Sequence, residues 1–495
     1  MQTTISASSA TPLKLGFIGG SIHSAVGYSH FISSGMDRRW QLVAGCFSKN
    51  TSTNNETAIA YGVSKEHLYD TWQAMLAKEK GQLDAIVILT PTPDHSESVI
   101  ACMRAGFAVI CEKSLAVGSE QARQILDVRN ELNAFLAVTY NYSGYPMLRE
   151  LAKRISDGKL GKVIHFQAEM PQEGFIRVDA HGNKPAPQSW RLSDGDIPTL
   201  HLDLAVHLHQ IIYYLTKQKP LELVSDQNHY GWFSGVVDNA SCLCRYTSEI
   251  QGQLWFSKSA LGHRNGLKIR IYGDQGSAEW VQSHPEELML AYVDGRREVL
   301  DRAASVEVTN QRRYNRFKAG HPAGFVEAFA NLYADIADAL QLFKNKGEWH
   351  STEVFSAELA LEGMYFLEAM VASAKTRAWQ TVGSSHGALA PVLAALQDVS
   401  DQHHNLNSEN SIDVEIKSFI LRLLEKKSKL PEKFNDGSDF IKEGIVDSIG
   451  IIKFILELES RFDIEINETD IETDDFRSVR GLVGLIRNKL TTKAK

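Results

Sequence analysis

The stretch LKLGFIGGSIHS (residues 13–24) decides the fold of the first part of the chain. It begins with a short apolar run bounded by glycine, which is typical of a buried β-strand. Gly19 and Gly20 then permit a tight turn in which backbone N–H groups approach a pyrophosphate at a helix N-terminus. Ser21 and Ser24 stand where G-x-G-x-x-G has its later glycines, so the motif alone also fits an ordinary strand-to-helix turn. We predict that a dinucleotide contacts Gly19, Gly20, Ser21 and Ile22.

Four further apolar runs follow, and helical stretches separate them. The runs are QLVAGCF, DAIVILT, FAVICEK and AFLAVTY, and one of the intervening stretches is SESVIACMRAG. Alternation of this kind indicates βαβ units and a parallel sheet. The sequence therefore predicts a doubly wound α/β Rossmann domain over residues 1–140.

Longer and more alternating apolar runs mark the next part of the chain. Runs such as KVIHFQAEM, ASCLCRYTS and LKIRIYG lie close together with turn signals between them, which indicates a mostly antiparallel sheet. Two helical segments with apolar residues at three-to-four spacing follow. We predict an α+β domain with an open, mostly antiparallel sheet over residues 141–382, for substrate binding and oligomerisation.

The last quarter of the chain changes character twice. Residues 383–411 are polar and poor in periodic apolar residues, which predicts a linker. Residues 412–495 contain three or four amphipathic helical runs, which predicts a separate all-α four-helix bundle.

The composition of the chain indicates its cellular compartment and the classes of partner that it does not bind. The chain has 495 residues and a net charge of −8, with no strongly basic face to attract nucleic acid. No segment approaches the roughly 18 apolar residues of a membrane span, and the first residues lack the pattern of a signal peptide. The five cysteines are scattered, as in reduced proteins. We expect a cytoplasmic protein with neither a membrane nor a nucleic-acid partner.

The end of the second predicted strand bears on the choice of cofactor. The run CFSKN (residues 46–50) has no acid to bind a ribose 2′-hydroxyl group. Ser48 and Lys49 instead offer a hydroxyl group and a positive charge, which suit a 2′-phosphate. Both NAD and NADP stay open as cofactors, with Ser48 and Lys49 as predicted contacts.

Two later motifs carry a resemblance to a known family. TPTPDH (residues 90–95) and CEKS (residues 111–114) resemble the T-P-x-x-x-H and E-K-P motifs of the Gfo/Idh/MocA oxidoreductases, which act mainly on sugars and cyclitols. Trp190-Arg191 and DLAVH (residues 203–207) look like the W-R and D-x-G-x-H parts of the same signature. The resemblance extends over about residues 13–382. Ser114 and Ala205 depart from it, where the family has proline and commonly glycine.

The resemblance implies a catalytic set. Hydride transfer from a carbinol carbon requires a group that takes the hydroxyl proton. By similarity, Lys113 binds the reacting oxygen and His207 acts as acid or base. Asp203, four residues before His207 on one helix face, positions the substrate or tunes Lys113 and His207. We expect structural roles for His201 and His209 and no metal site. The resemblance also implies cofactor contacts at Thr90, Pro91, Thr92, His95, Glu112 and Lys113, and substrate contacts at Asn141, Tyr145, Trp190 and Arg191.

The C-terminal part resembles a second family. The run DFIKEGIVDSIGIIKFILELESRFDIEI (residues 439–466) is similar to the acyl carrier proteins, in which a serine at a helix start carries phosphopantetheine. Ser448 is that serine by similarity, and its phosphate would lie near the positive end of the helix dipole. The resemblance implies a phosphopantetheinyl transferase as a partner. Between Glu457 and Asp475, nine acids are opposed only by Arg461, which suits docking onto basic acyl-loading or acyl-transfer enzymes.

Three functions remain open from the sequence. The first is a dehydrogenase for a free sugar-like or cyclitol-like compound, fused to a carrier that delivers an acyl group in the same pathway. The second is an oxidoreductase whose substrate is a thioester on its own carrier, where tethering raises the effective concentration. The third is a non-catalytic scaffold that binds nucleotide. By analogy with the family, we expect a homo-oligomer.

Overall fold

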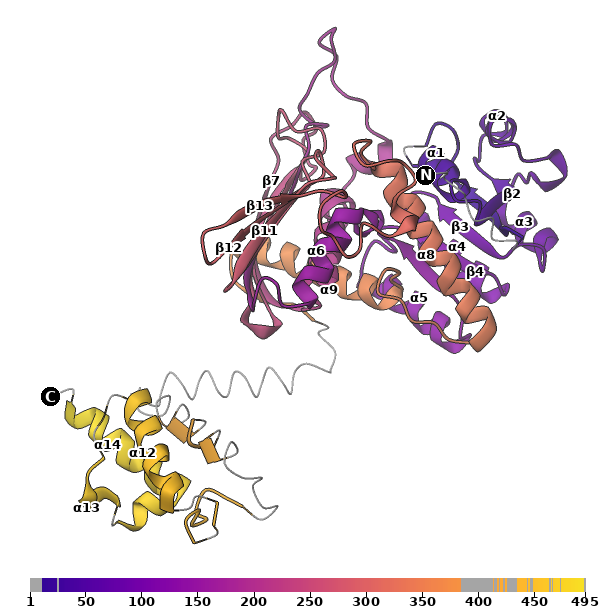
Figure 1. Cartoon of the computed structure of the whole chain (residues 1–495). Coiled ribbons are helices and arrows are strands. Elements are labelled where there is room, and N and C mark those ends of the chain that lie inside the picture. The colour runs from indigo at the N-terminus through magenta and orange to yellow at the C-terminus, as the bar shows by residue number, and fades with distance from the viewer. Residues whose placement is uncertain are drawn as a thin grey trace. The chain divides into compact units, whose positions relative to one another are not determined.

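The computed structural model describes residues 11–24, 26–383 and, with gaps, 413–493 (Figure 1). The chain forms two compact units, Met1–Ser385 and His386–Lys495, which are described separately. Apart from Gly383, the predicted linker lies outside the described residues.

Five parallel strands form the first sheet, in the order β2-β1-β3-β4-β5. β3 (AIVIL) is buried throughout, because helices cover both faces of such a sheet and leave no polar side to alternate with. The predicted Rossmann fold is confirmed. The strands are β1 Leu13–Gly19, β2 Trp40–Cys46, β3 Ala85–Leu89, β4 Ala108–Glu112 and β5 Leu136–Thr139. The helices are α1 Gly27–Gly35, α2 Thr51–Tyr61, α3 Trp72–Glu79, α4 His95–Arg104 and α5 Ser119–Glu131.

A nine-stranded sheet forms the second layer, in the order β13-β12-β11-β10-β6-β9-β8-β7-β14. All its pairs are antiparallel except β6 with β9, so the predicted mostly antiparallel sheet is confirmed. β8 (NASCLCRY) alternates buried and exposed residues, because helices cover only one of its faces. The strands are β6 Val163–Pro171, β7 Pro220–Asn228, β8 Asn239–Tyr246, β9 Gln251–Ser257, β10 Lys268–Gly273, β11 Gly276–Val281, β12 Leu288–Tyr292, β13 Arg297–Leu300 and β14 Gln380–Thr381.

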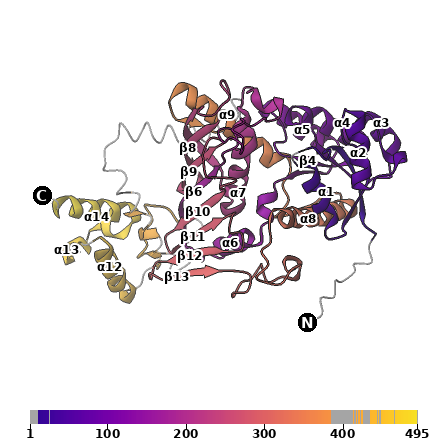
Figure 2. The same ribbon diagram turned by 90° about the horizontal axis from the view of Figure 1, so that it is seen from above.

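Three helices pack on the covered face of this sheet (Figure 2). They are α6 Pro146–Ser156, α7 Val206–Thr216 and α9 Ala357–Thr376, and α9 also packs against α5 of the first domain. The helix before α9, α8 (Phe325–Lys346), also packs on the first domain, where it contacts α1. The two sheets are thus joined through shared helices.

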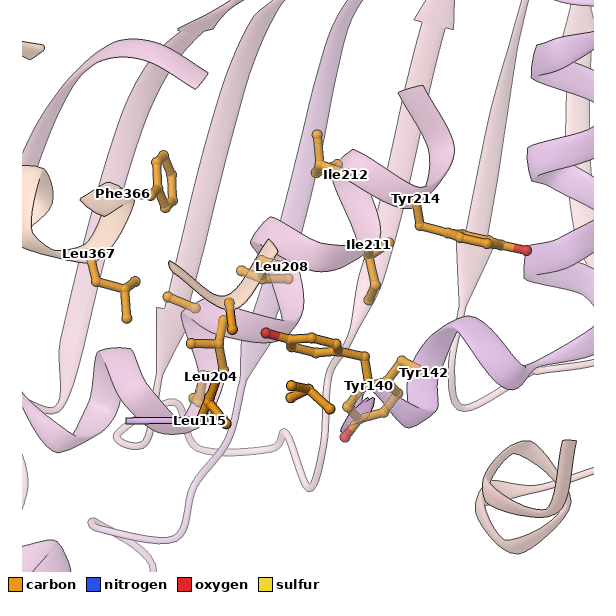
Figure 3. Packing of buried hydrophobic residues seen from close by; sticks show 14 of the residues in the cluster. Leu115, Tyr140, Tyr142, Leu204, Leu208, Ile211, Ile212, Tyr214, Phe366 and Leu367 are labelled. Carbon is orange, nitrogen blue, oxygen red and sulfur yellow. The ribbon is translucent and has the colours of Figure 1, made fainter. Parts of the chain in front are cut away.

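An apolar core holds α7 in place (Figure 3). Leu208, Ile211 and Ile212 of α7 are fully buried, and Phe366 and Leu367 of α9 belong to the same cluster. Burying each such side chain stabilises the fold by about 1.5–3 kcal/mol. This packing fixes the position of α7 and of residues His201–Ala205, which directly precede it.

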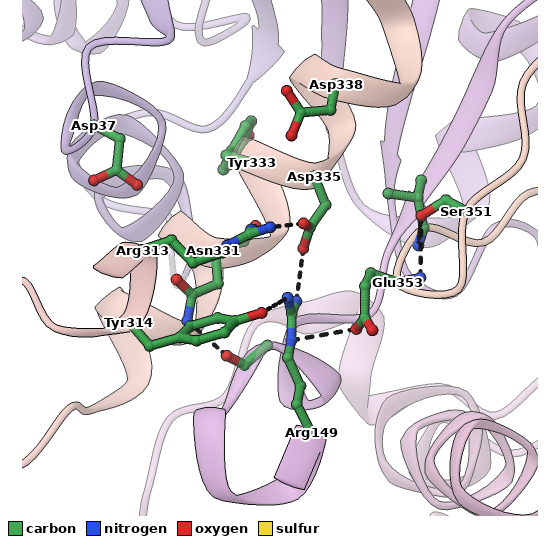
Figure 4. A network of polar contacts seen from close by, with 12 residues as sticks. Asp37, Arg149, Arg313, Tyr314, Asn331, Tyr333, Asp335, Asp338, Ser351 and Glu353 are labelled. Atoms are coloured by element: carbon green, nitrogen blue, oxygen red, sulfur yellow. Dashed lines mark hydrogen bonds and ion pairs between the residues drawn. The ribbon is translucent and has the colours of Figure 1, made fainter. Parts of the chain in front are cut away.

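A buried ion network ties α6 to α8 (Figure 4). Arg149 pairs with Asp335 at 2.7 Å and with Glu353 at 3.2 Å, and it donates hydrogen bonds to the Tyr314 hydroxyl and the Ser143 carbonyl. Burial alone would lower the pKa of Arg149, but Asp335 and Glu353 outweigh burial and raise the pKa well above its usual value. The guanidinium is therefore charged and fully compensated.

The C-terminal unit is a small helical bundle. Its described helices are α12 Ser448–Phe462, α13 Glu468–Ile471 and α14 Val479–Lys493, and further helical residues lie between Asp413 and Leu424. Phe440, Phe454, Leu458 and Phe476 form the centre of its core. Within the described ranges of the whole chain, no helix is long and apolar enough to cross a membrane.

Candidate active site

A cavity of about 420 Å³ opens at the carboxyl ends of the parallel strands. This edge is where open α/β sheets bind ligands, at the point where strand order reverses between β1 and β3. The cavity extends from the ends of β1 and β2 to the π-helix His201–Ala205 (η5), which precedes α7. Its walls include the predicted residues Gly19, Gly20, Ser21, Ser48, Lys49, Thr90, Pro91, Thr92, Glu112, Lys113, Trp190, Arg191 and Asp203.

The turn after β1 requires glycine at two positions. Gly19 and Gly20 have φ angles of +80° and +74°, a region that other residues rarely adopt. A Cβ atom on Gly19 would come within 2.7 Å of the Leu89 carbonyl oxygen, and one on Gly20 within 2.4 Å of Leu89 Cδ1. The turn therefore lies directly against the end of β3. The neighbouring Ile22 donates its backbone N–H to Thr57 Oγ1 at 3.2 Å.

A third glycine lies later than the sequence motif suggested. Gly27 is the first residue of α1, and a Cβ atom there would come within 2.1 Å of the Gly20 carbonyl oxygen. The Ser24 hydroxyl accepts hydrogen bonds from the backbone N–H groups of Val26 and Gly27, just before this helix and at its first residue. The spacing G-G-x₆-G does not match G-x-G-x-x-G, which is why motif reading missed it.

The end of β2 forms a polar rim without a carboxylate of its own. Ser48 Oγ accepts a hydrogen bond from the Asn50 backbone, and Asn50 caps α2 by accepting from the Thr53 backbone at 3.0 Å. Lys49 is almost fully exposed and lies 3.6 Å from Asp94. The glycine turn and this rim together suit the pyrophosphate and ribose of a dinucleotide.

His95 supports the loops that carry the site. Its Nδ1 lies 2.7 Å from the Ser114 carbonyl oxygen and its Nε2 lies 2.8 Å from the Thr90 carbonyl oxygen. Burial lowers the pKa of His95 despite these contacts, so the ring is neutral and one nitrogen donates at a time. Ser114, where the family has proline, donates its hydroxyl to the Leu202 carbonyl at 2.8 Å. His95 thus joins the end of β3 to the Lys113 loop.

Glu112 faces the protein interior with its carboxylate. It accepts hydrogen bonds from Thr139 Oγ1 at 2.5 Å and His30 Nε2 at 3.1 Å. Burial alone would raise the pKa of Glu112, but the contacts with His30 and the charge of Lys113 outweigh it and lower the pKa. The carboxylate is therefore ionised and anchors β4 next to Lys113.

Asp203 is the centre of the inner wall of the cavity. Lys113 Nζ lies 2.9 Å from Asp203 Oδ1 and 2.9 Å from its carbonyl oxygen. Arg191 Nη1 and Lys258 Nζ each lie 2.6 Å from Asp203 Oδ2. Burial alone would raise the pKa of Asp203, but Lys113, Lys258 and Arg191 outweigh it and hold the pKa well below its usual value. One ionised carboxylate thus pairs with three cations.

Sequence reasoning did not find Lys258. It directly follows β9, and its Nζ also lies 4.9 Å from the centre of the Phe175 ring. Burial lowers the pKa of Lys258, and the neighbouring Asp203 opposes this change. Lys258 lies 55 positions after Asp203 in the chain, and no sequence motif links two residues at that spacing. Its contact with Asp203 is therefore seen only in the folded structure.

His207 lies one turn beyond Asp203, at the start of α7. Burial, with the charge of Lys113, lowers the pKa of His207 to about 3, so its ring is neutral. Its Nδ1 is buried and has no hydrogen-bond partner among the described residues. The ring packs edge-on against Tyr142 at 4.6 Å. His207 is not among the residues that line the cavity.

The predicted substrate residues fall into two groups. Trp190 and Arg191 line the cavity, with the guanidinium 4.5 Å from the centre of the Trp190 ring. Asn141 and Tyr145 are buried: the Asn141 amide nitrogen has no partner among the described residues, and the Tyr145 hydroxyl accepts a hydrogen bond from Gln282 at 3.1 Å. Only the first group borders the open space.

The two histidines predicted to be structural lie inside the protein. His201 is fully buried, burial lowers its pKa to about 3, and neither ring nitrogen has a partner in the described part of the chain. His209 lies 3.5 Å from Glu362. In the C-terminal unit, Ser448 is the first residue of α12. The first N–H groups of a helix have no partner within the helix and can bind a phosphate.

Comparison with known proteins agrees with this geometry. Residues 13–140 match the oxidoreductase family with an NAD-binding Rossmann fold, residues 148–279 match the GFO/IDH/MocA C-terminal domain, and residues 418–486 match the phosphopantetheine attachment site. The uncharacterized oxidoreductase YfiI of Bacillus subtilis is 30% identical over 375 residues, which are 73% of this chain and 95% of that protein.

Two further relatives have more informative names. Inositol 2-dehydrogenase of Rhizobium meliloti is 24% identical over 291 residues, which are 57% of this chain and 80% of that protein. The crystal structure of an inositol dehydrogenase homolog from Azotobacter vinelandii, complexed with NADH and myo-inositol, superposes with a TM-score of 0.67 at 25% identity. It covers 75% of this chain and 98% of that one. The chain therefore belongs to the GFO/IDH/MocA oxidoreductase family and joins an NAD-binding enzyme to a domain with a phosphopantetheine attachment site.

Proposed function

We propose that the chain transfers a hydride between NAD(P) and a CH–OH or C=O group of a sugar-like or cyclitol-like compound. Its carrier domain would hold an acyl group for the same pathway on phosphopantetheine at Ser448. The contact of Lys113 with Asp203, at the inner end of a cavity shaped for a dinucleotide, carries the first part of the proposal. The related inositol dehydrogenases support a polyhydroxylated substrate.

Lys113 would bind the reacting oxygen. When bound, the nicotinamide ring accepts the hydride in oxidation and supplies it in reduction. The side chain of Lys113 is 14% exposed, and its ammonium group donates two hydrogen bonds to Asp203, so its third N–H bond is available to a substrate oxygen. A positive charge at this place offsets the negative charge that develops on the oxygen as its proton leaves.

His207 would move the proton. In oxidation the carbinol C–H bond breaks with its electron pair, the O–H proton leaves, and a C=O bond forms. We assign this proton to His207, whose ring is neutral and whose buried Nδ1 has no partner among the described residues. Because His207 does not line the cavity, a water molecule would carry the proton to it from the reacting oxygen. Asp203 orients Lys113.

The experiment measures hydride transfer by NADH or NADPH absorbance across a panel of polyols and their ketones, in wild type and Lys113→Met. We expect kcat to fall by about 10²–10⁴-fold, the usual contribution of a positioned acid–base group. NADH binding, measured by fluorescence, should remain detectable, because the glycine turn and the end of β2 are unchanged. Lys219→Met is the matched control, because Lys219 pairs with Glu362 beyond the far end of α7. Full turnover in Lys113→Met would remove this lysine from the mechanism.

A further inference from the structure

The charges around Asp203 do not balance. Lys113, Arg191 and Lys258 converge on this one carboxylate within 2.9 Å. The other acid of the inner wall, Glu112, has its carboxylate hydrogen-bonded to His30 and Thr139. Three cations thus face two ionised acids, Asp203 and Glu112, which leaves a surplus of one positive charge at the inner wall of the cavity.

Two neighbouring acids, Asp194 and Asp238, bind backbone N–H groups and form no ion pair with these three cations among the described residues. Asp194 accepts hydrogen bonds from the backbones of Thr199 and Val237. Asp238 accepts from the backbones of Tyr230 and Gly231. In the described part of the chain, Lys258 pairs with no carboxylate except that of Asp203.

Burial makes the surplus costly. The side chains of Lys258 and Lys113 are only 7% and 14% exposed. A buried charge without a full counter-charge destabilises the folded protein, and a bound anion would remove this cost. The negative charge that develops on the oxygen of a neutral polyol exists only during the reaction. While a neutral substrate is bound at rest, one of the three positive charges therefore has no counter-charge among the described residues.

We propose that the substrate carries an anionic substituent, a carboxylate or a phosphate, which Arg191 and Lys258 bind beside Lys113. This inference rests on the proposed function and names the substrate class of the same site: a sugar acid or a sugar phosphate.

The geometry of Arg191 suits this role. Its guanidinium lines the cavity, is 21% exposed and rests on the Trp190 ring. Only one of its nitrogens, Nη1, contacts Asp203, so the planar group keeps further N–H donors for an anion. Lys258 Nζ and Arg191 Nη1 meet at the same oxygen, Asp203 Oδ2, and an incoming anion would share both.

The experiment compares three probes of similar size: D-glucose, D-glucuronate and D-glucose 6-phosphate. Isothermal titration calorimetry measures the affinity of each for the full chain saturated with NADH, so the readout does not depend on turnover. We expect at least one anion to bind about tenfold more tightly than glucose, which corresponds to about 1.4 kcal/mol. The stronger of the two anions identifies the carboxylate or the phosphate as the group that is bound.

Substitutions of Lys258 and Arg191 test whether these two residues cause the preference for an anion over glucose. Lys258→Met should lose most of the preference for the anion over glucose, whereas Lys258→Arg should retain it. Arg191→Gln, at a partly exposed position, is the second variant if Lys258→Met unfolds, and it should lose the preference as well. Lys219→Met should behave as wild type.

Two results overturn the inference. One is equal affinity for glucose and both anions, which would mean that the positive charge serves only the reacting oxygen. The other is no detectable binding of either anion at millimolar concentration. Failure of the proposed function looks different, because turnover would then persist in Lys113→Met while the anion preference remained.

Discussion

The two units of this chain place their chemistry in opposite ways. In the N-terminal unit, the side chains that meet at Asp203 come from the end of β4, from η4 (Ser189–Leu192) and from the residue after β9. In the C-terminal unit, the proposed chemistry belongs to Ser448, at the first residue of α12. A site built from distant segments depends on the whole fold, whereas a site on a helix start depends on one local element. The two should therefore respond differently to mutation and to acid.

The largest effect is expected at Ser448. Ser448→Ala should abolish attachment of phosphopantetheine, because no hydroxyl group remains at the helix start. Intact-mass spectrometry after incubation with a phosphopantetheinyl transferase and coenzyme A measures this directly. Hydride transfer on a free substrate should stay at the wild-type rate, and its loss would favour a substrate tethered to the carrier. If Ser448→Ala gained the same mass as wild type, phosphopantetheine would be attached to another residue.

The second effect tests how far the N-terminal unit depends on its buried ion network. Arg149→Met leaves Asp335 and Glu353 buried with fewer partners, so we expect the unit to lose about 3–5 kcal/mol of stability. Calorimetry of the full chain should show its transition at a lower temperature and the carrier transition unchanged. Lys153→Met, on the exposed side of the same helix, should leave both midpoints in place. A joint shift of both transitions would contradict independent units.

The third effect tests the cofactor turn. Gly27→Ala places a methyl group within 2.1 Å of the Gly20 carbonyl oxygen, so α1 and the turn must move apart. We expect a loss of about 1–3 kcal/mol in stability and weaker NADH binding, measured by thermal unfolding and fluorescence titration. Gly35→Ala, at the other end of the same helix, meets nothing within 4 Å and should keep wild-type affinity. Equal affinity in the two variants would exclude Gly27 from shaping the turn.

The smallest expected effect is the loss of stability as the pH falls. Burial lowers the pKa of His201 to about 3, against about 6.5 in an unfolded chain. Between these values the unfolded state binds more protons, so the stability that His201 contributes is full above about pH 6.5 and is lost as the pH falls. The loss should be about 1.4 kcal/mol between about pH 7.5 and about pH 5.5.

Denaturant titrations of wild type and His201→Leu at both pH values measure this loss. The variant should show a smaller decrease. The carrier unit is the internal control, because residues 412–495 contain no histidine. An equal decrease in both proteins would show that other groups cause the acid sensitivity.

Much of the fold followed from local pattern. Buried apolar runs such as AIVIL predicted the parallel sheet, and alternating runs such as the one in β8 predicted a mostly antiparallel sheet. The parallel pairing of β6 with β9 was not predicted, because it joins residues 86 positions apart, such as His165 and Gln251, and leaves no local signal. The contact of α8 with α1 escaped prediction for the same reason.

The site divides in the same way. The sequence by itself determined the glycine turn at Gly19 and Gly20, the strand-end position of Lys113, and the spacing of Asp203 and His207, because each depends on residues close together in the chain. Only the tertiary structure decided that Gly27 closes the turn and that Lys258 and Arg191 share one oxygen of Asp203. Charges and close contacts act through space, so their balance exists only once the fold brings distant residues together.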